Sequence, residues 1–202
     1  VYKDILNSDM KKQDELRGKI VVTLFYEAST RTRMSFEEAG KILGSDVINV
    51  SASGSSVEKG ESLVNTAKTI EAMNVDAVVI RHPHSGAPYI LADQFASASV
   101  VNAGDGTHAH PTQALLDLFT VLEHVDSIEG LKIAIVGDVI HSRVARSNIH
   151  GFLKLGAHVF LAGPATLLPK AMPWLRYYES EGSLSMTTNV DEALKDADVV
   201  MT

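Results

Sequence analysis

The sequence predicts an α/β protein built from two doubly wound parallel-sheet domains, the second of which is incomplete. Short runs of β-branched and aliphatic residues alternate along the chain with longer stretches of helical period. This alternation is typical of parallel sheets whose faces are covered by helices. Clusters of polar residues follow several predicted strands, and ligands bind at the carboxyl ends of strands in open parallel sheets.

The composition limits the class of protein. Of the 202 residues, 45% are hydrophobic, which is enough to bury a core in one large or two small domains. The formal net charge of −7 opposes general binding to nucleic acid or to an acidic membrane. We find no apolar run long enough to span a bilayer and no signal peptide. Cysteine is absent, which excludes disulfides and fits a reducing compartment, so we expect a cytoplasmic protein.

The elements are predicted from the period of their apolar residues. Strands are expected at residues 19–26, 46–50, 76–80, 99–102, 132–137, 158–162, 185–188 and 198–202. Helices are expected at residues 32–43, 62–73, 88–95, 112–124, 143–155 and 190–195. In the first helix Phe36, Ala39, Gly40 and Leu43 fall on one face, as an amphipathic helix requires.

A domain boundary is predicted at residues 126–130, between a long helix and a strand that could begin a second sheet. We therefore expect domains at residues 1–128 and 129–202. The second ends on a strand at Thr202, whereas a doubly wound unit closes with further helices, so we expect it to be partial.

The segment from Glu27 to Arg33 predicts an anion site. Ser29 and Thr30 follow a strand and precede an amphipathic helix, whose free N–H groups and positive dipole end attract an anion. Thr32 adds a hydroxyl, and Arg31 adds a guanidinium that matches phosphate oxygens. Ser-Thr before a helix is by itself more often an ordinary cap, but Arg31 in the same turn favours phosphate.

A second cluster lies at residues 102–113. Gly104 and Gly106 permit a tight turn. His110 and Gln113, three residues apart at the start of a helix, could together bind a carbonyl oxygen and an NH2 group. His108 and His110 could instead hold a metal, but two histidines without a third ligand are a weak pattern, as are His82 and His84.

Three further segments carry cations. Arg81 ends a strand, where a lone arginine is often solvated, but its neighbouring strands end in the anion cluster. Residues 51–61 contain Ser55 and Lys59 and are typical of either a flexible linker or a mobile cationic loop. Arg143 lies near the start of a helix, and the preceding turn has no G-x-G-x-x-G pattern, which disfavours a nucleotide-binding dehydrogenase.

Together these motifs resemble the aspartate/ornithine carbamoyltransferase family. Residues 29–33 with 35–37 resemble its carbamoyl phosphate signature, and residues 110–113 resemble its second motif. Three segments, at residues 102–106, 55–61 and 137–148, are more similar to aspartate than to ornithine carbamoyltransferases. The resemblance extends over residues 16–202.

The resemblance implies transfer of a carbamoyl group from carbamoyl phosphate to the amine of L-aspartate, in pyrimidine synthesis. It implies a carbamoyl phosphate-binding domain at 1–128 and a partial aspartate-binding domain at 129–202. It also implies roles for the site residues. The phosphate would be held by Ser29, Thr30, Arg31 and Thr32, and the carbonyl oxygen would face Thr32, Arg81 and His110. The carbamoyl nitrogen would face Gln113, and an aspartate carboxylate would bind Arg143.

The resemblance further implies a homotrimer in which Ser55 and Lys59 enter the neighbouring subunit's site, and a role for Glu27 in joining the domains. No metal or organic cofactor is implied, and a regulatory chain or a dihydroorotase could associate. Family members continue past Thr202 into an Arg-x-Gln segment that binds aspartate, so we expect the chain to bind carbamoyl phosphate at best moderately and to turn over negligibly.

Two rival functions stay open at this stage. Ornithine carbamoyltransferase uses the same first substrate, although Arg143 and Lys59 favour an acidic acceptor. An inactive anion-binding module would tolerate replacement of Arg81 or His110 by alanine without loss of function in cells.

Overall fold

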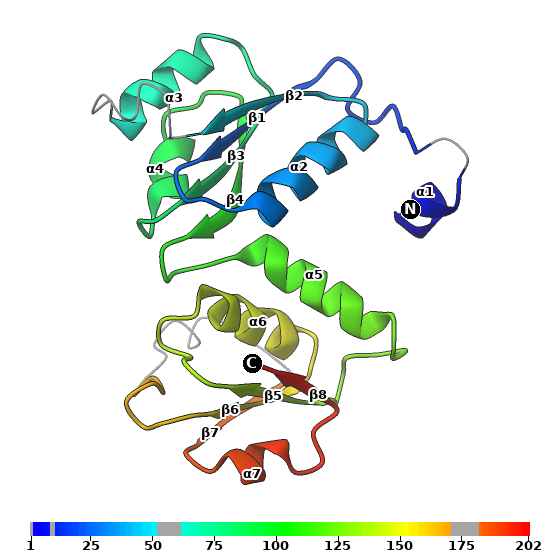
Figure 1. Cartoon of the computed structure of the whole chain (residues 1–202), viewed down its shortest axis with the longest axis vertical. Coiled ribbons are helices and arrows are strands. Elements are labelled where there is room, and N and C mark those ends of the chain that lie inside the picture. Colours follow the sequence, from blue (N-terminus) through cyan, green and yellow to red (C-terminus); the bar gives the residue numbers. More distant parts are fainter. Residues whose placement is uncertain (1, 9–10, 52–61, 171–181) are drawn as a thin grey trace. The chain divides into compact units, whose positions relative to one another are not determined.

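The computed structural model of the chain describes residues 2–8, 11–51, 62–170 and 182–202. They form two compact units, Val1–Asp105 and Gly106–Thr202, each containing a four-stranded sheet (Figure 1). All strand pairs are parallel, and helices cover both faces of each sheet. The predicted fold class is therefore confirmed. In the described part of the chain, every helix is too short or too polar to cross a bilayer.

The first unit has the strand order β2-β1-β3-β4. Its elements are α1 (Tyr2–Asn7), β1 (Ile20–Phe25), α2 (Thr30–Ile42), β2 (Asp46–Ser51), α3 (Leu63–Glu71), β3 (Ala77–His82), α4 (Ala87–Ala92) and β4 (Ser99–Asp105). Alternate residues of β1 face opposite sides of the sheet. Val22 and Leu24 pack with Ala67 and Ile70 of α3, whereas Val21 and Phe25 belong to the apolar cluster that Phe36 of α2 covers.

The second unit has the strand order β7-β6-β5-β8. Its elements are α5 (Pro111–Leu122), β5 (Lys132–Val136), α6 (Arg143–Lys154), β6 (His158–Ala162), β7 (Ser183–Thr187), α7 (Val190–Leu194) and β8 (Val199–Met201). On one face Ile149 and Phe152 of α6 join a large apolar cluster with Ile133 of β5. On the other, Ala193 of α7 packs on Ala134.

Most predicted elements are found, with differences at their ends. Strand β4 continues three residues past the predicted end, β7 begins two residues earlier than predicted, and α1 was not predicted. Of the four residues predicted to share the packed face of α2, Gly40 is buried but Ala39 is exposed. The compact units divide between Asp105 and Gly106. The functional domain boundary at residues 128/129 stays a prediction.

The same connection from helix to strand occurs in both sheets. Asn74 and Asp196 are the non-glycine residues with positive φ, 54° and 53°, in the described part of the chain. Two residues after each comes an aspartate, Asp76 or Asp198, whose carboxylate accepts the backbone N–H of the first residue of the neighbouring strand. These distances are 2.9 Å to Ile20 N and 2.8 Å to Lys132 N. The two aspartates therefore fix where a later strand starts beside the first strand of its sheet.

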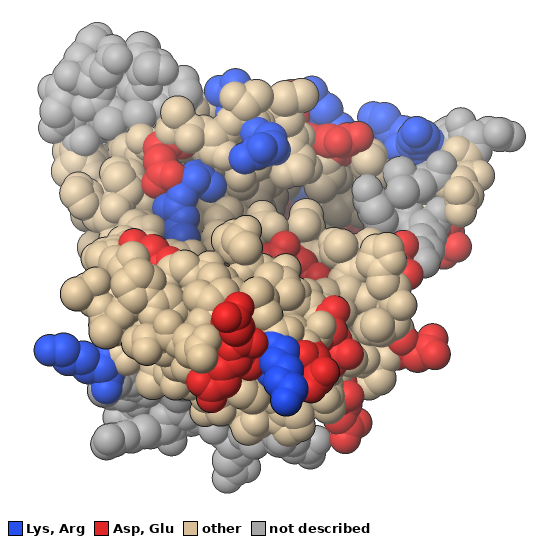
Figure 2. Space-filling view, turned by 60° about the horizontal axis from the view of Figure 1, so that its bottom comes forward, with Lys and Arg blue, Asp and Glu red and all other residues tan. Residues whose placement is uncertain are grey.

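Acidic side chains gather on the surface near α7. Asp191 and Glu192 lie in the first turn of that helix, where a negative charge complements the helix dipole. Figure 2, in which this end of the molecule comes forward, shows Asp and Glu side chains around a basic one. Part of the excess negative charge of the sequence is therefore found on this face.

Candidate functional site

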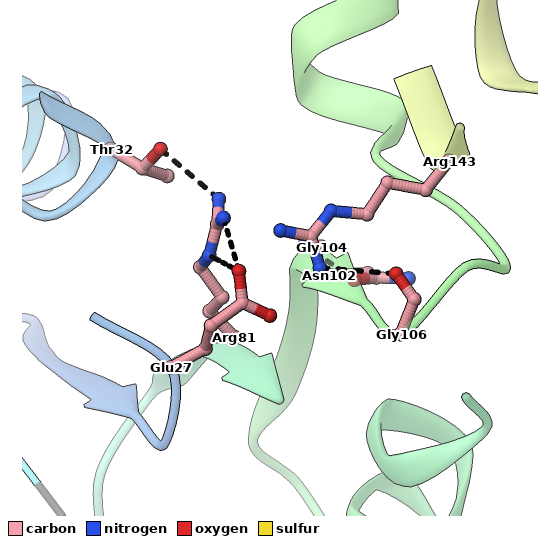
Figure 3. A network of polar contacts seen from close by, with 7 residues as sticks. All are labelled: Glu27, Thr32, Arg81, Asn102, Gly104, Gly106 and Arg143. Carbon is pink, nitrogen blue, oxygen red and sulfur yellow. Dashed lines mark hydrogen bonds and ion pairs between the residues drawn. The ribbon is translucent and has the colours of Figure 1, made fainter. Parts of the chain in front are cut away.

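Arg81 is the centre of a polar network at the carboxyl ends of β1 and β3 (Figure 3). Its Nε and Nη2 donate to Oε1 of Glu27 at 3.2 and 2.5 Å, and its Nη1 donates to Oγ1 of Thr32 at 3.4 Å. The Arg81 side chain is only 11% exposed. It is thus not a solvated rim residue but a half-buried cation with a fixed plane, next to the first turn of α2.

A bulge in β4 lies opposite Arg81. Ile80 pairs with Asn102 but His82 pairs with Asp105, so β4 has one extra residue across from Arg81. Gly104 has φ 117°, a conformation that other residues rarely adopt. Asn102 stabilises the bulge: its Oδ1 accepts from Gly104 N and its Nδ2 donates to Oδ1 of Asp105, each at 2.8 Å. Bulges often occur next to active sites, where they redirect a side chain.

The amino end of α2 is open to a ligand. Ser29 is its N-cap residue, with extended φ and ψ of −159° and 100°, but its hydroxyl makes no capping hydrogen bond within the described residues. In contrast, Ser62 and Ser142 cap α3 and α6 with their hydroxyls. The first N–H groups of a helix lack partners within the helix, so those of α2 can bind an anion. Thr30 and Arg31 are exposed there, and Thr32 is half-buried.

An aromatic row lies at the same edge of the first sheet. The ring centroids of Tyr26 and His82 are 4.7 Å apart, and those of His82 and His84 are 5.2 Å apart. His82 Nδ1 accepts the N–H of His84 at 3.0 Å, which requires that nitrogen to be unprotonated. Burial, and secondly the charge of His84, lower the pKa of His82. His82 is therefore neutral at pH 7.

In the second unit, α5 begins at a buried histidine. His110 is the N-cap residue of α5 and is 6% exposed, and its N–H donates to Oγ of Ser147 on α6 at 2.8 Å. Gln113 follows in the first turn, with Nε2 donating to Oδ1 of Asp117 at 2.8 Å. Asn148 on α6 donates to Oδ2 of the same carboxylate at 2.7 Å. The predicted pair His110 and Gln113 is thus held by contacts between α5 and α6.

Within the described ranges, the histidine pairs are not part of a larger ligand set. In the part of the chain that the structure describes, no group of three or more His, Cys, Asp or Glu side chains could hold a metal ion. His108 is half-buried and contributes, after burial and Arg146, to lowering the pKa of His150.

Arg143 lies at the first position of α6, as predicted. Its Nη1 donates to the carbonyl oxygen of Gly106 at 3.1 Å (Figure 3). In the turn before α6, the Asp138 carboxylate accepts the backbone N–H of His141 at 3.1 Å and lies 2.9 Å from Nδ1 of the His141 ring. The N–H of His141, and then its imidazole, lower the pKa of Asp138. Next to these residues, a cavity of about 270 Å³ opens at the carboxyl ends of β5 and β8, lined in part by Asp138, Ser142 and Asn148.

The predicted site residues thus fall into two groups, one in each unit. In the first unit the structure brings Thr32 and Arg81 together and places Ser29, Thr30 and Arg31 around the start of α2. In the second it places His110 and Gln113 at the start of α5 and Arg143 at the start of α6. Ser55 and Lys59 lie outside the described residues.

Three supporting residues were not predicted from the sequence. Asp117 and Asn148 orient Gln113, and Ser147 holds the backbone of His110. The spacing of four residues between Gln113 and Asp117 on one helix was a readable signal. Ser147 and Asn148 had no such signal because they act from another helix.

Two family models match consecutive parts of the chain. The carbamoyl-P binding domain of aspartate/ornithine carbamoyltransferases matches residues 2–123, and the Asp/Orn binding domain matches residues 129–202. The chain belongs to the aspartate/ornithine carbamoyltransferase family.

Similar sequences within this carbamoyltransferase family are named aspartate carbamoyltransferase catalytic subunits. The one from Roseiflexus sp. (strain RS-1) is 55% identical over 200 residues, which are 99% of this chain and 62% of that protein. The one from Pelotomaculum thermopropionicum is 57% identical over 199 residues, again 62% of its length. The chain therefore spans about three fifths of the length of these relatives.

Solved structures of the family are also similar. Aspartate transcarbamoylase from Trypanosoma cruzi, in complex with carbamoyl phosphate and aspartate, has a TM-score of 0.83 at 32% identity; the match covers 94% of this chain and 64% of that chain. The catalytic subunit of the M. jannaschii enzyme has a TM-score of 0.81 at 37% identity, with 98% and 64% covered.

Proposed function

We propose that the protein transfers the carbamoyl group of carbamoyl phosphate to the α-amine of L-aspartate, giving N-carbamoyl-L-aspartate and phosphate. The observation that carries this proposal is Arg81, a half-buried cation held by Glu27 and Thr32 beside the open amino end of α2. Further support comes from relatives named as aspartate carbamoyltransferase catalytic subunits and from the Trypanosoma enzyme solved with both substrates.

The phosphate would bind at the start of α2. The backbone N–H groups of the first turn would donate to its oxygens, together with the hydroxyls of Ser29, Thr30 and Thr32. Arg31 would add a guanidinium, whose planar donors suit a phosphate. Neutralising the phosphate in this way assists its departure as a leaving group.

The carbonyl oxygen would face Thr32, Arg81 and His110. Attack of the aspartate amine on the carbonyl carbon creates a tetrahedral intermediate with a negative oxygen. The bond from this carbon to the phosphate oxygen then breaks, and the proton of the attacking amine passes to the departing phosphate. Fixed donors at such an oxygen can each lower the activation free energy by about 2.7–4 kcal/mol. The fixed plane of Arg81 therefore matters as much as its charge.

Gln113 would bind the carbamoyl NH2 group, and Arg143 would bind an aspartate carboxylate. In the assembled protein, Ser55 and Lys59 would act in the site of a neighbouring subunit within a homotrimer, and Glu27 would also help to join the domains. The chemistry needs only side chains, backbone donors and proximity, with neither a metal nor an organic cofactor. The proposed location is the cytoplasm, with a regulatory chain or a dihydroorotase as an optional partner.

Because this chain alone is expected to turn over negligibly, the test is an assay of the purified full-length, assembled protein with labelled carbamoyl phosphate and either L-aspartate or L-ornithine. We expect label in N-carbamoyl-L-aspartate alone, and loss of at least about a hundredfold in kcat/KM for Arg81→Ala. The matched control is Arg17→Ala, which removes an exposed arginine of the same unit. Product formation from ornithine, or an Arg81→Ala variant as active as the wild type, would refute the proposal.

A further inference from the structure

The carboxylate of Asp117 lies between two amide side chains. Gln113, four residues earlier on α5, donates to its Oδ1 at 2.8 Å, and Asn148 on α6 donates to its Oδ2 at 2.7 Å. All three residues belong to the second unit, and Asp117 is half-buried while Asn148 is completely buried. The carboxylate therefore uses one oxygen for each amide.

An ionised carboxylate can only accept hydrogen bonds, so it decides which end of each amide faces it. The Nε2 end of Gln113 must turn toward Asp117, and its Oε1 must then point to the other side. Without this neighbour, rotation of the carboxamide by a half turn would present a donor there instead. Asp117 thus makes the outward atom of Gln113 an acceptor.

Asn148 fixes the carboxylate itself. Its Nδ2 is bound to Asp117, whereas its Oδ1 is buried with no hydrogen-bond partner within the described residues. The orientation of Asn148 therefore follows from the charge-assisted bond to Asp117. Because Asn148 lies on α6, the carboxylate is anchored to a second helix and does not follow the side-chain motion of α5 alone.

We propose that Asp117 is a positioning residue that makes Gln113 selective for an NH2 group on the ligand. This inference rests on the proposed function, in which Gln113 faces the carbamoyl nitrogen. Carbamoyl phosphate and acetyl phosphate share the phosphate and the carbonyl oxygen and differ by NH2 against CH3. An acceptor fixed at Oε1 gains a hydrogen bond from an NH2 group. Against a methyl group it loses its bound water and gains no hydrogen bond in exchange.

The test measures the dissociation constants of both ligands by calorimetry, and their ratio is the selectivity. In Asp117→Asn the neighbour has the same shape but can donate as well as accept, so the Gln113 amide can adopt both orientations. We expect the selectivity for carbamoyl phosphate to fall about three- to tenfold, with the affinity for acetyl phosphate unchanged. A residue that only supported the fold would weaken both ligands alike.

A charge swap provides the rescue. The double variant combines Gln113→Glu with Asp117→Asn. The amide at position 117 then donates to one oxygen of the carboxylate at position 113. The second oxygen of that carboxylate stays free as an acceptor for the ligand. We expect the selectivity to return, although the relocated charge weakens both anionic ligands. Glu123→Gln, which removes an exposed carboxylate at the end of the same helix, should leave the ratio unchanged.

The outcomes separate the two proposals. If the wild type does not prefer carbamoyl phosphate, the proposed function and this inference both fail. If the wild type is selective and Gln113→Ala abolishes the selectivity, but Asp117→Asn retains it or the swap does not restore it, only the positioning role of Asp117 is wrong.

Discussion

Two nitrogens of Arg81 bind the same carboxylate oxygen of Glu27: Nε and Nη2 both donate to Oε1, at 3.2 and 2.5 Å. This arrangement fixes the guanidinium plane by one of its edges. The remaining nitrogen, Nη1, is directed to Thr32 at the start of α2. The cation most central to the proposed chemistry is therefore oriented before any ligand arrives.

Replacing Glu27 by glutamine tests this orientation. The variant keeps the shape of the side chain but removes the charge, and hydrogen bonds to charged groups contribute about 1.5–3 kcal/mol. We expect kcat/KM for carbamoyl phosphate to fall about ten- to a hundredfold, measured by initial rates of the full-length, assembled protein. Glu38→Gln removes an exposed carboxylate from α2 and should have no effect. Equal activities of the two variants would show that Glu27 does not orient Arg81.

The bulge in β4 gives a prediction on stability. Asn102→Ala removes the side chain that binds both Gly104 and Asp105, which leaves the buried Asp105 with one partner fewer. We expect the free energy of unfolding in urea to drop by about 1–3 kcal/mol, and activity to drop with it. Asn65→Ala on the exposed face of α3 is the control. An Asn102→Ala protein as stable as this control would contradict the role given to the bulge.

Acid should weaken the first unit through His82. Its pKa lies below the ordinary value of 6.5 because of burial, so the unfolded chain takes up a proton at a pH where the folded chain does not. The contribution of His82 is therefore fully present above pH 6.5 and is lost as the pH falls toward its folded pKa. We expect a shallower decline of unfolding free energy between about pH 7.5 and 5 in His82→Gln than in the wild type.

Urea titrations at several pH values make this comparison. His150→Gln should act in the same direction, since burial also lowers the pKa of His150. His124→Gln, which removes an exposed histidine after α5, is the control variant. A steeper slope for His82→Gln would be the opposite sign and would exclude the mechanism.

Asp198 should contribute to the second sheet. Asp198→Ala removes the acceptor for Lys132 N at the start of β5, at an expected cost of about 0.5–1.5 kcal/mol because the bond is exposed. Chemical unfolding followed by circular dichroism measures this loss, with the exposed loop residue Asp126→Ala as the control. Unchanged stability of Asp198→Ala would show that the strand start is fixed by the β5–β8 pairing alone.

Local patterns in the sequence were sufficient to predict the fold class and the buried elements. Strand β6 begins and ends at the predicted residues because its apolar pattern is strong. Strand β7 was placed two residues too late because it is largely exposed, although Leu184 and Met186 alternate with polar residues. Helix α1 is short and has little helical period, so it was missed.

The parts of the site that could not be predicted depend on pairs of distant segments. The motif that contains Arg31 and Thr32 is read from one stretch of sequence, and it does lie at the start of a helix. The bulge opposite Arg81 arises only from the pairing of β3 with β4. The contact of Asn148 with Asp117 likewise requires α6 to pack on α5. A single sequence gives no signal for such contacts.

Asp76 and Asp198 hold their strands at the amino ends, whereas the candidate ligand-binding side chains follow the carboxyl ends. One strand pair in each sheet is thus held at the end remote from the candidate ligand-binding residues. We expect that segments at the carboxyl ends can be exchanged or lengthened in laboratory evolution without shifting these strand pairs. An engineer who seeks a different amine acceptor should accordingly leave these two aspartates untouched and vary the opposite edge.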